Sequence, residues 1–253
     1  MRELTVAVLQ LPLARPDAAD NIAAVSKLVE DAAAKGAQII LPPELFAGEY
    51  FCREEEEGLF ALAHPTGESP SVMAMQELAV RLQVAIPTSF FERDGQHYYN
   101  TLAMIGPDGE IMGTYRKSHI PDGPGYEEKY YFRPGNDGFK VWDVFGARIG
   151  IGICWDQWYP EAARLTALQG AEVLFYPTAI GWHPSEKNKY GDHQYGAWMN
   201  VMKGHAVANG TYVAAANRIG LEKYVPNTDG IEFWGASFIA GPQGAILAQA
   251  SHD

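Results

Sequence analysis

Cysteine, positive charge and long apolar runs are all scarce in this chain. Its 253 residues include two cysteines, Cys52 and Cys154, which are too few for a disulfide framework. A reducing, cytoplasmic location is therefore expected, and it would keep a thiol available for chemistry. No apolar stretch reaches the length of a transmembrane span, and the N-terminus lacks the pattern of a signal peptide. We therefore expect no membrane partner.

Basic residues are outnumbered by acidic ones, 19 to 31, which gives a net charge of −12 at pH 7 with neutral histidine. Nucleic acids and anionic membranes are bound through basic patches, so neither is an expected partner. The acidic balance is compatible with a small cationic substrate.

Cofactor and metal motifs are also missing. No glycine-rich nucleotide fingerprint follows any predicted strand. His183, His193 and His205 lack the close spacing of a zinc site, and the chain has no Cys-x-x-Cys pair. We expect neither an organic cofactor nor a catalytic metal. His205 falls on an apolar helix face, where a buried structural histidine is the plainer interpretation.

The stretch 148–170 has the clearest local pattern in the chain. Isoleucine alternates with glycine over 149–153, which is the period of a strand. The glycines leave one face of that strand bare, so another layer can approach closely. Cys154 ends the strand, and a helix follows with Pro160 in its first turn and Gly170 at its end. The pattern predicts a strand, an elbow and a helix that display one cysteine at a strand end.

Strands alternate with helices along the rest of the chain. A strand at 4–11, a helix at 21–35 and a strand at 38–41 predict a βαβ unit, which requires part of the sheet to be parallel. No linker divides the sequence, so we expect one domain over 1–253. The other predicted elements are helices at 69–82 and 193–209, strands at 85–91, 101–105, 110–116, 173–177, 212–217, 235–240 and 245–250, and long loops at 122–138 and 179–192.

Three polar residues lie at or just beyond the ends of predicted strands: Glu44, Lys117 and Cys154. Together they would make an acyl-transfer set. The thiol attacks a carbonyl carbon, the carboxylate moves the proton, and the ammonium stabilises the oxyanion. From these residues alone two plainer interpretations stay open. Glu44 and Lys117 can form a simple charge pair, and a free cysteine can pack as a small apolar residue.

Three blocks of sequence resemble the catalytic blocks of the nitrilase superfamily of carbon–nitrogen hydrolases: PELF at 43–46, YRKSHIP at 115–121 and CWDQWYPEAAR at 154–164. The resemblance continues along almost the whole chain. It implies a four-layer α-β-β-α sandwich of the nitrilase type. Further matching segments are FYPTAIG at 175–181, GHAVAN at 204–209, NRIG at 217–220 and SFIAGPQG at 237–244.

The resemblance implies a role for each residue of a Glu–Lys–Cys triad. Glu44 becomes the general base and acid, Lys117 the oxyanion stabiliser and Cys154 the nucleophile. A second glutamate assists in many members, and Glu127 and Glu128 both compete for that place. We prefer Glu128 because of its spacing to the Pro-Gly pair at 134–135.

The resemblance implies one further group beside the triad, and the neighbouring residues suggest others. The backbone N–H of Trp155 should hold the oxyanion together with the lysine. Tyr50 and Tyr126 are candidates for the pocket wall, with packing as the plainer interpretation. His119 is expected to orient its loop, and Cys52 is expected to be structural.

Within the superfamily, HIPDGPGYEEKYYF at 119–132 and the cysteine block most resemble the N-carbamoylputrescine amidase branch. The implied reaction converts N-carbamoylputrescine to putrescine, carbon dioxide and ammonia. Alternatives are N-carbamoyl-β-alanine, another N-carbamoyl amino acid or an ω-amide as substrate, and a non-catalytic nitrilase-like binding module. A cationic substrate would need an acid in the pocket, and the candidates are Glu186, Asp192, Glu222, Asp229 and Glu232.

Members of the superfamily typically self-associate, through the helices that follow the nucleophile strand, so we expect a homodimer or a larger homo-oligomer. The predicted strand at 245–250 follows the block at 237–244, and members of the superfamily usually continue after it with another strand and a C-terminal tail. The residues after that block run only to Asp253, so we expect no counterpart of that tail within 1–253.

Overall fold

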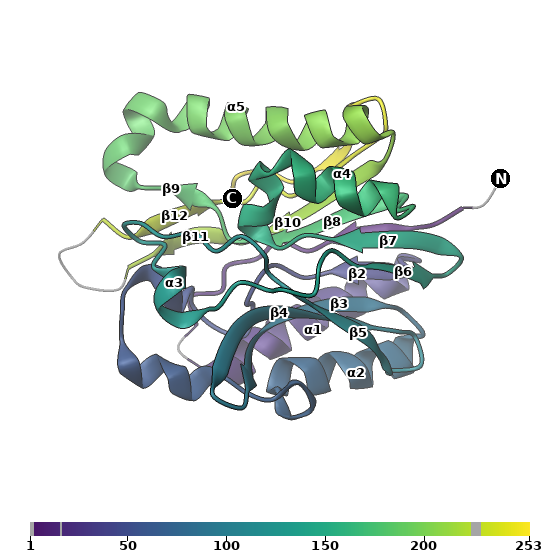
Figure 1. Cartoon of the computed structure of the whole chain (residues 1–253), viewed down its shortest axis with the longest axis horizontal. Coiled ribbons are helices and arrows are strands. Elements are labelled where there is room, and N and C mark those ends of the chain that lie inside the picture. The colour runs from purple at the N-terminus through teal and green to yellow at the C-terminus, as the bar shows by residue number, and fades with distance from the viewer. Residues whose placement is uncertain (1–2, 16, 224–228) are drawn as a thin grey trace.

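The computed structural model describes residues 3–15, 17–223 and 229–253. Two layers of strands lie face to face between two layers of helices (Figure 1). Helices α1 (Ala18–Ala34) and α2 (Pro70–Leu82) cover one outer face, and α4 (Pro160–Leu168) and α5 (Pro184–Asn209) cover the other. The predicted four-layer α-β-β-α sandwich is confirmed.

The first strand layer begins with the predicted βαβ unit. Strands β1 (Val6–Val8) and β2 (Ile39–Leu41) pair in parallel, with α1 as the crossover between them. Strands β3 (Ile86–Asp94), β4 (His97–Ile105) and β5 (Ile111–Arg116) form an antiparallel meander. A parallel bridge between Ile39 and Ala85 joins the meander to β2.

The second strand layer is a six-stranded sheet in the order β14-β13-β10-β8-β7-β6. Its centre is parallel, since β7 and β10 both pair in parallel with β8. The carboxyl ends of parallel strands meet at one edge, where ligand sites of α/β proteins are usually found. The strands are β6 (Val141–Val144), β7 (Ala147–Ile151), β8 (Val173–Thr178), β10 (Tyr212–Asn217), β13 (Phe238–Ala240) and β14 (Ile246–Gln249).

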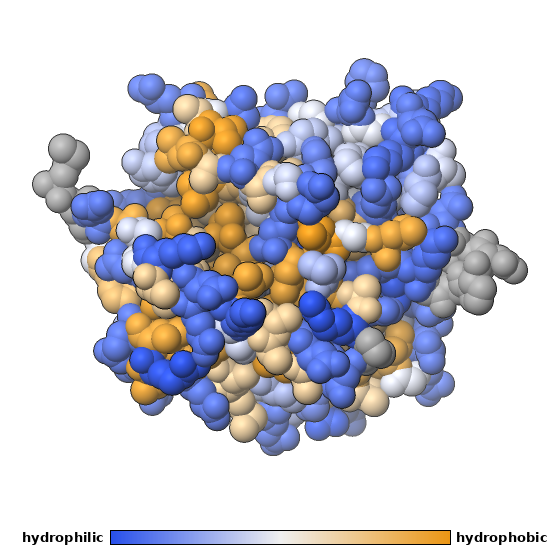
Figure 2. All heavy atoms as spheres, turned by 180° about the vertical axis from the view of Figure 1, so that it is seen from behind, coloured by the Kyte–Doolittle hydropathy of each residue, from blue (hydrophilic) through white to orange (hydrophobic). Residues whose placement is uncertain are grey.

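Three apolar interfaces hold the four layers together. Val25 of α1 and Leu78 of α2 belong to the cluster under the first layer, and Leu102 and Ile149 belong to the cluster between the two layers. Trp198 of α5 packs in the third cluster, on the outer face of the second sheet. Each such side chain contributes about 1.5–3 kcal/mol when fully buried. On the face shown in Figure 2, apolar side chains gather in a band between the two helical layers.

Close packing on β7 follows from its glycines, as the sequence predicted. A Cβ atom at Gly150 would lie 2.3 Å from the Cγ2 atom of Thr166 in α4. A Cβ atom at Gly152 would lie 2.6 Å from the ring of Tyr176 in β8. The elbow after β7 is therefore pressed between a helix and a neighbouring strand.

Two segments predicted as long loops contain regular structure. The loop at 122–138 includes helix α3 (Glu128–Tyr131), and the loop at 179–192 includes β9 (Gly181–Trp182) and the first turns of α5. That half of α5 is polar and shows no apolar period, because it covers little of the core. Elements that the sequence did not predict are β6, β11 (Ile219–Glu222) and β12 (Ile231–Trp234), together with the 3-10 helices η1 (Phe51–Arg53), η2 (Glu57–Leu62) and η3 (Thr66–Glu68).

Candidate active site

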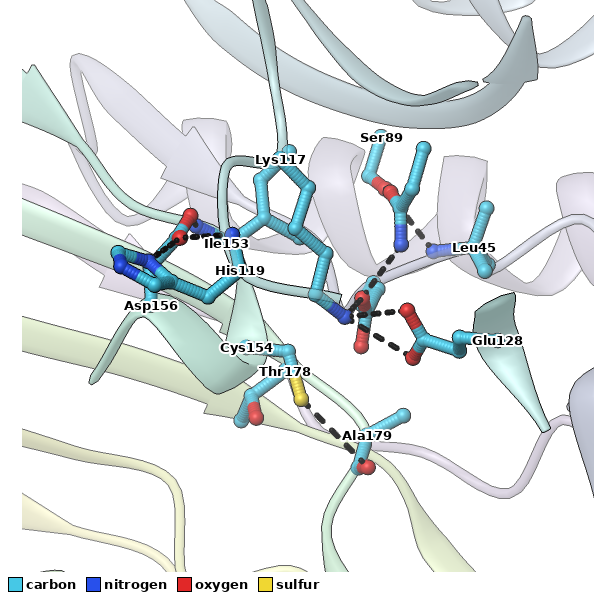
Figure 3. Close-up of polar contacts among 12 residues, drawn as sticks. Leu45, Ser89, Lys117, His119, Glu128, Ile153, Cys154, Asp156, Thr178 and Ala179 are labelled. Atoms are coloured by element: carbon cyan, nitrogen blue, oxygen red, sulfur yellow. Dashed lines mark hydrogen bonds and ion pairs between the residues drawn. The ribbon is translucent and has the colours of Figure 1, made fainter. Parts of the chain in front are cut away.

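The fold brings the three predicted polar residues together from three different strands. Glu44 follows β2, Lys117 follows β5 and Cys154 follows β7. Figure 3 shows the lysine reaching between the cysteine and Glu128. Lys117 has no exposed surface, Glu44 has none, and Cys154 is 5% exposed. Several charged groups are buried together in this way mainly at functional sites, where burial and neighbouring charges shift their pKa values.

Lys117 is the centre of a fully buried charge cluster. Its Nζ atom donates to Glu44 Oε1 at 2.9 Å and to both carboxylate oxygens of Glu128, at 2.9 and 2.7 Å. Asn100 Nδ2 donates to the same Glu44 oxygen at 2.7 Å. Among the described residues, Glu44 Oε2 is buried and has no hydrogen-bond partner. The second oxygen of Glu44 is thus available to accept a proton from another group.

Of the two competing glutamates, Glu128 contacts the lysine. It is the first residue of α3, and Tyr50 Oη donates to its Oε1 atom at 2.6 Å. Glu127 is the residue just before α3, and its backbone N–H donates to the carbonyl of Cys52 at 2.7 Å.

Cys154 begins the 3-10 helix η4 (Cys154–Trp158) with a φ of 42°. Leu45, the residue after Glu44, has a φ of 48°. A residue with a side chain in this left-handed region costs about 1–3 kcal/mol, and such residues cluster at active sites. The Cys154 Sγ atom lies 3.7 Å from the carbonyl oxygen of Ala179, which follows β8. The thiol is thus held at the carboxyl edge of the second sheet.

The pKa values of the cluster follow from its burial and its charges. Burial raises the pKa of the Cys154 thiol, and the charge on Glu44 raises it further, so the thiol is protonated at neutral pH. Burial also raises the pKa of Glu128 to about 7, against the opposing effect of Lys117. Burial lowers the pKa of Lys117, but Glu128 and Glu44 outweigh it, so that pKa lies well above its usual value. A neutral thiol beside a carboxylate requires proton transfer before it can attack.

A second buried ion pair supports the loop that carries Glu44. Arg218 Nη2 donates to the carbonyl oxygens of Glu44, at 2.8 Å, and Leu45, at 3.1 Å. Arg218 Nη1 donates to Glu222 Oε1 at 3.0 Å. Glu222 Oε2 in turn accepts the backbone N–H of Tyr50 at 2.7 Å. Arg218 lies in the NRIG segment, whose local pattern gives no sign of this role.

A pocket of about 490 Å³ opens over the cysteine. Its described walls contain one carboxylate, Asp122, and neither lysine nor arginine. Most of the rest is aromatic or small, and the aromatic residues are Tyr126, Trp155, Trp158 and Trp234. Aromatic faces beside a carboxylate suit a cationic ligand.

The structure places the two candidate tyrosines differently. Tyr50 is fully buried and is not among the residues that line the described pocket, whereas Tyr126 is. The Tyr50 hydroxyl donates a hydrogen bond to Glu128, so Tyr50 lies behind the site. Trp155, the residue after Cys154, does line the pocket.

None of the five acids considered from the sequence lines the described pocket. Glu222 pairs with Arg218, and Glu232 pairs with Lys187 at 2.6 Å. The carboxylate that does line the described pocket, Asp122, was not among the acids predicted from the sequence. Its position was visible in the block 119–132, directly after the lysine segment, but nothing local distinguishes it from a solvated loop residue.

Residues 5–253 match the family described as carbon-nitrogen hydrolase. This chain belongs to the carbon–nitrogen hydrolase family. As a member it is an enzyme that hydrolyses carbon–nitrogen bonds of amides. The prediction of nitrilase-superfamily membership is therefore confirmed.

Similar proteins include two kinds of hydrolase at nearly equal identity. N-carbamoylputrescine amidase of Arabidopsis thaliana is 51% identical over 98% of this chain and 83% of its own length. Citrullinase of Francisella tularensis is 48% identical over 99% of this chain and 85% of its own length. A carbon-nitrogen hydrolase from Helicobacter pylori has a TM-score of 0.93 at 37% identity, over 99% of this chain and 86% of that one.

The described residues of the hydrolase contain no group of three or more His, Cys, Asp or Glu side chains placed to hold a metal ion. No helix within 3–15, 17–223 and 229–253 is both long and apolar enough to cross a membrane. His205 is buried, and its Nε2 atom lies 2.7 Å from the carbonyl oxygen of Gln157, as expected of a structural histidine.

Proposed function

We propose that this hydrolase acts on N-carbamoylputrescine through Glu44, Lys117 and Cys154. The observation that carries the choice of substrate is the pocket over Cys154, with Asp122 as its one described carboxylate and neither lysine nor arginine on its described walls. N-carbamoylputrescine offers a ureido group at one end and an ammonium at the other. The relatives named N-carbamoylputrescine amidase support the same substrate.

The first half of the proposed reaction forms a bond to sulfur. Glu44 takes the thiol proton, and Cys154 Sγ attacks the ureido carbonyl carbon. The Lys117 ammonium and the Trp155 N–H hold the resulting oxyanion. Glu44 then passes its proton to the departing nitrogen, the carbon–nitrogen bond breaks, and ammonia leaves. The remaining carbamoyl carbon stays on Sγ as a thiocarbamate ester.

The second half restores the enzyme. Glu44 takes a proton from water, the hydroxide attacks the thiocarbamate carbon, and the carbon–sulfur bond breaks as the thiol regains its proton. The product is a carbamic acid, which decays to carbon dioxide and putrescine. Every proton passes through Glu44, whose Oε2 atom has no other partner among the described residues. No step calls for a metal or an organic cofactor.

Citrulline is the second candidate, because the similarity to citrullinase is nearly as high. It carries the same ureido group and an ammonium, but it also carries a carboxylate. N-carbamoyl-β-alanine and other N-carbamoyl amino acids share that carboxylate. A buried carboxylate without a cationic partner is unfavourable, so the described pocket favours the diamine derivative over all of them.

The thiol dependence of ammonia release tests the chemistry. With N-carbamoylputrescine, Cys154→Ala should reduce turnover by about four orders of magnitude or more, because losing the nucleophile disables the whole catalytic unit. Cys52→Ala is the matched control, since Cys52 is the other buried cysteine, and it should retain turnover. Turnover that survives in Cys154→Ala would refute the proposed mechanism.

We further propose a cytoplasmic homo-oligomer built from one hydrolase domain over 1–253. Both cysteines are free thiols, which suits a reducing compartment. Leu165 and Leu168 of α4 are 50% and 70% exposed, and Val207 of α5 is 57% exposed. Clustered exposed apolar side chains are typical of a subunit contact.

A further inference from the structure

Asp156 is a fully buried acid that the proposed reaction does not use. It lies two residues after Cys154, and its side chain accepts four hydrogen bonds. Oδ2 accepts the backbone N–H of Ile153 at 2.9 Å and the hydroxyl of Tyr115 at 2.7 Å. Oδ1 accepts the backbone N–H of His119 at 3.0 Å and the His119 Nδ1 donor at 2.7 Å. Figure 3 shows this carboxylate beside His119 and Ile153, on the opposite side of the lysine segment from Glu128.

The four donors come from two separate segments of the chain. Ile153 immediately precedes the strained Cys154, whereas Tyr115 and His119 lie two residues before and two residues after Lys117. One carboxylate therefore ties the end of β5 to the turn after β7. Each tied segment carries one of the two groups proposed to hold the oxyanion.

The surroundings keep this carboxylate in one position. The His119 ring stacks on Tyr159 with a centroid distance of 3.6 Å and an interplanar angle of 10°. The Tyr115 hydroxyl lies 3.1 Å from Ser118 Oγ and its ring is fully buried. Both side-chain donors are thus held in place by contacts of their own.

We propose that Asp156 is a positioning residue that fixes Lys117 and the Trp155 N–H relative to each other. The inference rests on the proposed function, because it concerns the two oxyanion donors of that reaction. Oxyanion donors work only within about 2.7–3.1 Å of the developing charge, and a shift of about 1 Å costs about 100-fold in rate. Two donors on separate segments need a rigid link to keep that geometry.

Asparagine at this position would break the link without removing volume. Its amide has one oxygen and two N–H groups, so one of the two backbone N–H donors, that of Ile153 or that of His119, would face another N–H group. Asp156→Asn should therefore weaken the hydrogen bonds either to the segment that carries Lys117 or to the segment that carries Cys154. The exposed Asp143 (79% exposed side chain) offers a matched control, Asp143→Asn.

The test compares two reactions of the same thiol. Ammonia release from N-carbamoylputrescine needs the oxyanion donors, whereas alkylation of Cys154 by iodoacetamide is a displacement at saturated carbon and does not. In Asp156→Asn we expect kcat to fall about 100-fold, with KM and the alkylation rate of Cys154 within about 3-fold of wild type. Asp143→Asn should match wild type in all three values.

Tyr115→Phe provides a milder variant, which removes one of the four bonds and keeps the ring. We expect kcat to fall by about 5-fold, from the loss of about 1 kcal/mol, with alkylation unchanged. If kcat and the alkylation rate fall together in both variants, or if kcat stays at the wild-type value in either, the inference is overturned. The wild type is measured first. A wild type without turnover contradicts the proposed function and this inference with it, whereas an active wild type isolates the role of Asp156.

Discussion

Lys117 is an ammonium group without exposed surface, and its two neighbouring carboxylates keep it charged. Glu44 and Glu128 raise its pKa more than burial lowers it. The same burial keeps Cys154 protonated, so the site holds a neutral thiol, a cation and a carboxylate, Glu44, that accepts a hydrogen bond from that cation. This distribution of charge suits acyl transfer better than a simple ion pair would.

That Glu44, Lys117 and Cys154 would lie near one another could be predicted from the sequence because each follows a recognisable strand, whereas their roles came only from the resemblance to the nitrilase superfamily. The groups that support them could not be predicted. Arg218 contacts the carbonyl of Glu44 across 174 positions of sequence, and Tyr50 contacts Glu128 across 78. Neither partner carries a local pattern, since only the packed layers bring them together.

Arg218→Met tests the support of the Glu44 loop. The substitution leaves Glu222 buried without its cation, and removing one partner of a buried pair costs about 3–5 kcal/mol of unfolding free energy. Urea denaturation measures this loss. Arg164→Met, at an exposed arginine, is the control and should cost less than about 1 kcal/mol. An equal, small effect of both substitutions would contradict the role of Arg218.

The raised pKa of Glu128 predicts that the stability of the folded protein depends on pH. Its folded-state pKa of about 7 lies above its usual value of 4.5, so the folded protein holds this proton more tightly than the unfolded chain. The resulting stabilisation is complete below about pH 4.5 and is lost as pH rises through about 7, a change of about 3 kcal/mol.

Comparison of wild type with Glu128→Gln isolates this effect in urea denaturation at about pH 5 and about pH 8. The comparison is needed because His205, whose pKa is lowered by burial, contributes with the opposite sign near neutral pH. The wild type should lose more stability between the two pH values than the variant. A smaller loss in the wild type would show that Glu128 is not held protonated.

At the scale of elements, the unit β7–η4–α4 was predictable because its signals are local. Alternating glycines, one proline and one terminal glycine define it within 148–170. Helix α5 was predicted only from residue 193 onward, although it begins at Pro184. Its polar first half is held by tertiary contacts, such as the bond from Trp182 Nε1 to the carbonyl of Gly191 at 3.1 Å.

Gly150→Ala tests the close contact between β7 and α4. The added methyl would lie 2.3 Å from Thr166 Cγ2, and overpacking of this kind costs about 1–3 kcal/mol. Gly204→Ala in α5 is a control of opposite sign, because nothing lies within 4 Å of its Cβ position and alanine favours a helix by about 1 kcal/mol. Thermal unfolding distinguishes them, and a stabilised Gly150→Ala would contradict the close packing of β7 on α4.

At the scale of the whole molecule, the loops that carry Glu44, Lys117 and Cys154 meet at a shared edge of the two strand layers, and the pocket opens over Cys154. The net charge of −12 surrounds a pocket whose described walls carry one carboxylate. A long-range field of this sign attracts a cation to the surface, but selection between cations depends on the contact inside the pocket.

Asp122→Asn tests that contact. A hydrogen bond to a charged partner contributes about 1.5–3 kcal/mol, so KM for N-carbamoylputrescine should rise about 10-fold or more, with a smaller change in kcat. Asp137→Asn is the matched control, since Asp137 is also exposed and also pairs with a lysine, Lys140, as Asp122 pairs with Lys129. A KM that rises equally in both variants would show that Asp122 does not take part in substrate recognition.

The most direct test of the proposed function is kcat/KM for ammonia release from N-carbamoylputrescine, citrulline and N-carbamoyl-β-alanine by the same wild-type preparation. All three present a ureido group to Cys154, and they differ in the charges at the other end. A pocket with a carboxylate and neither lysine nor arginine on its described walls predicts a preference of about 10-fold or more for N-carbamoylputrescine. A preference for either carboxylate-bearing substrate would contradict the proposed substrate while leaving the hydrolysis of the ureido group in place.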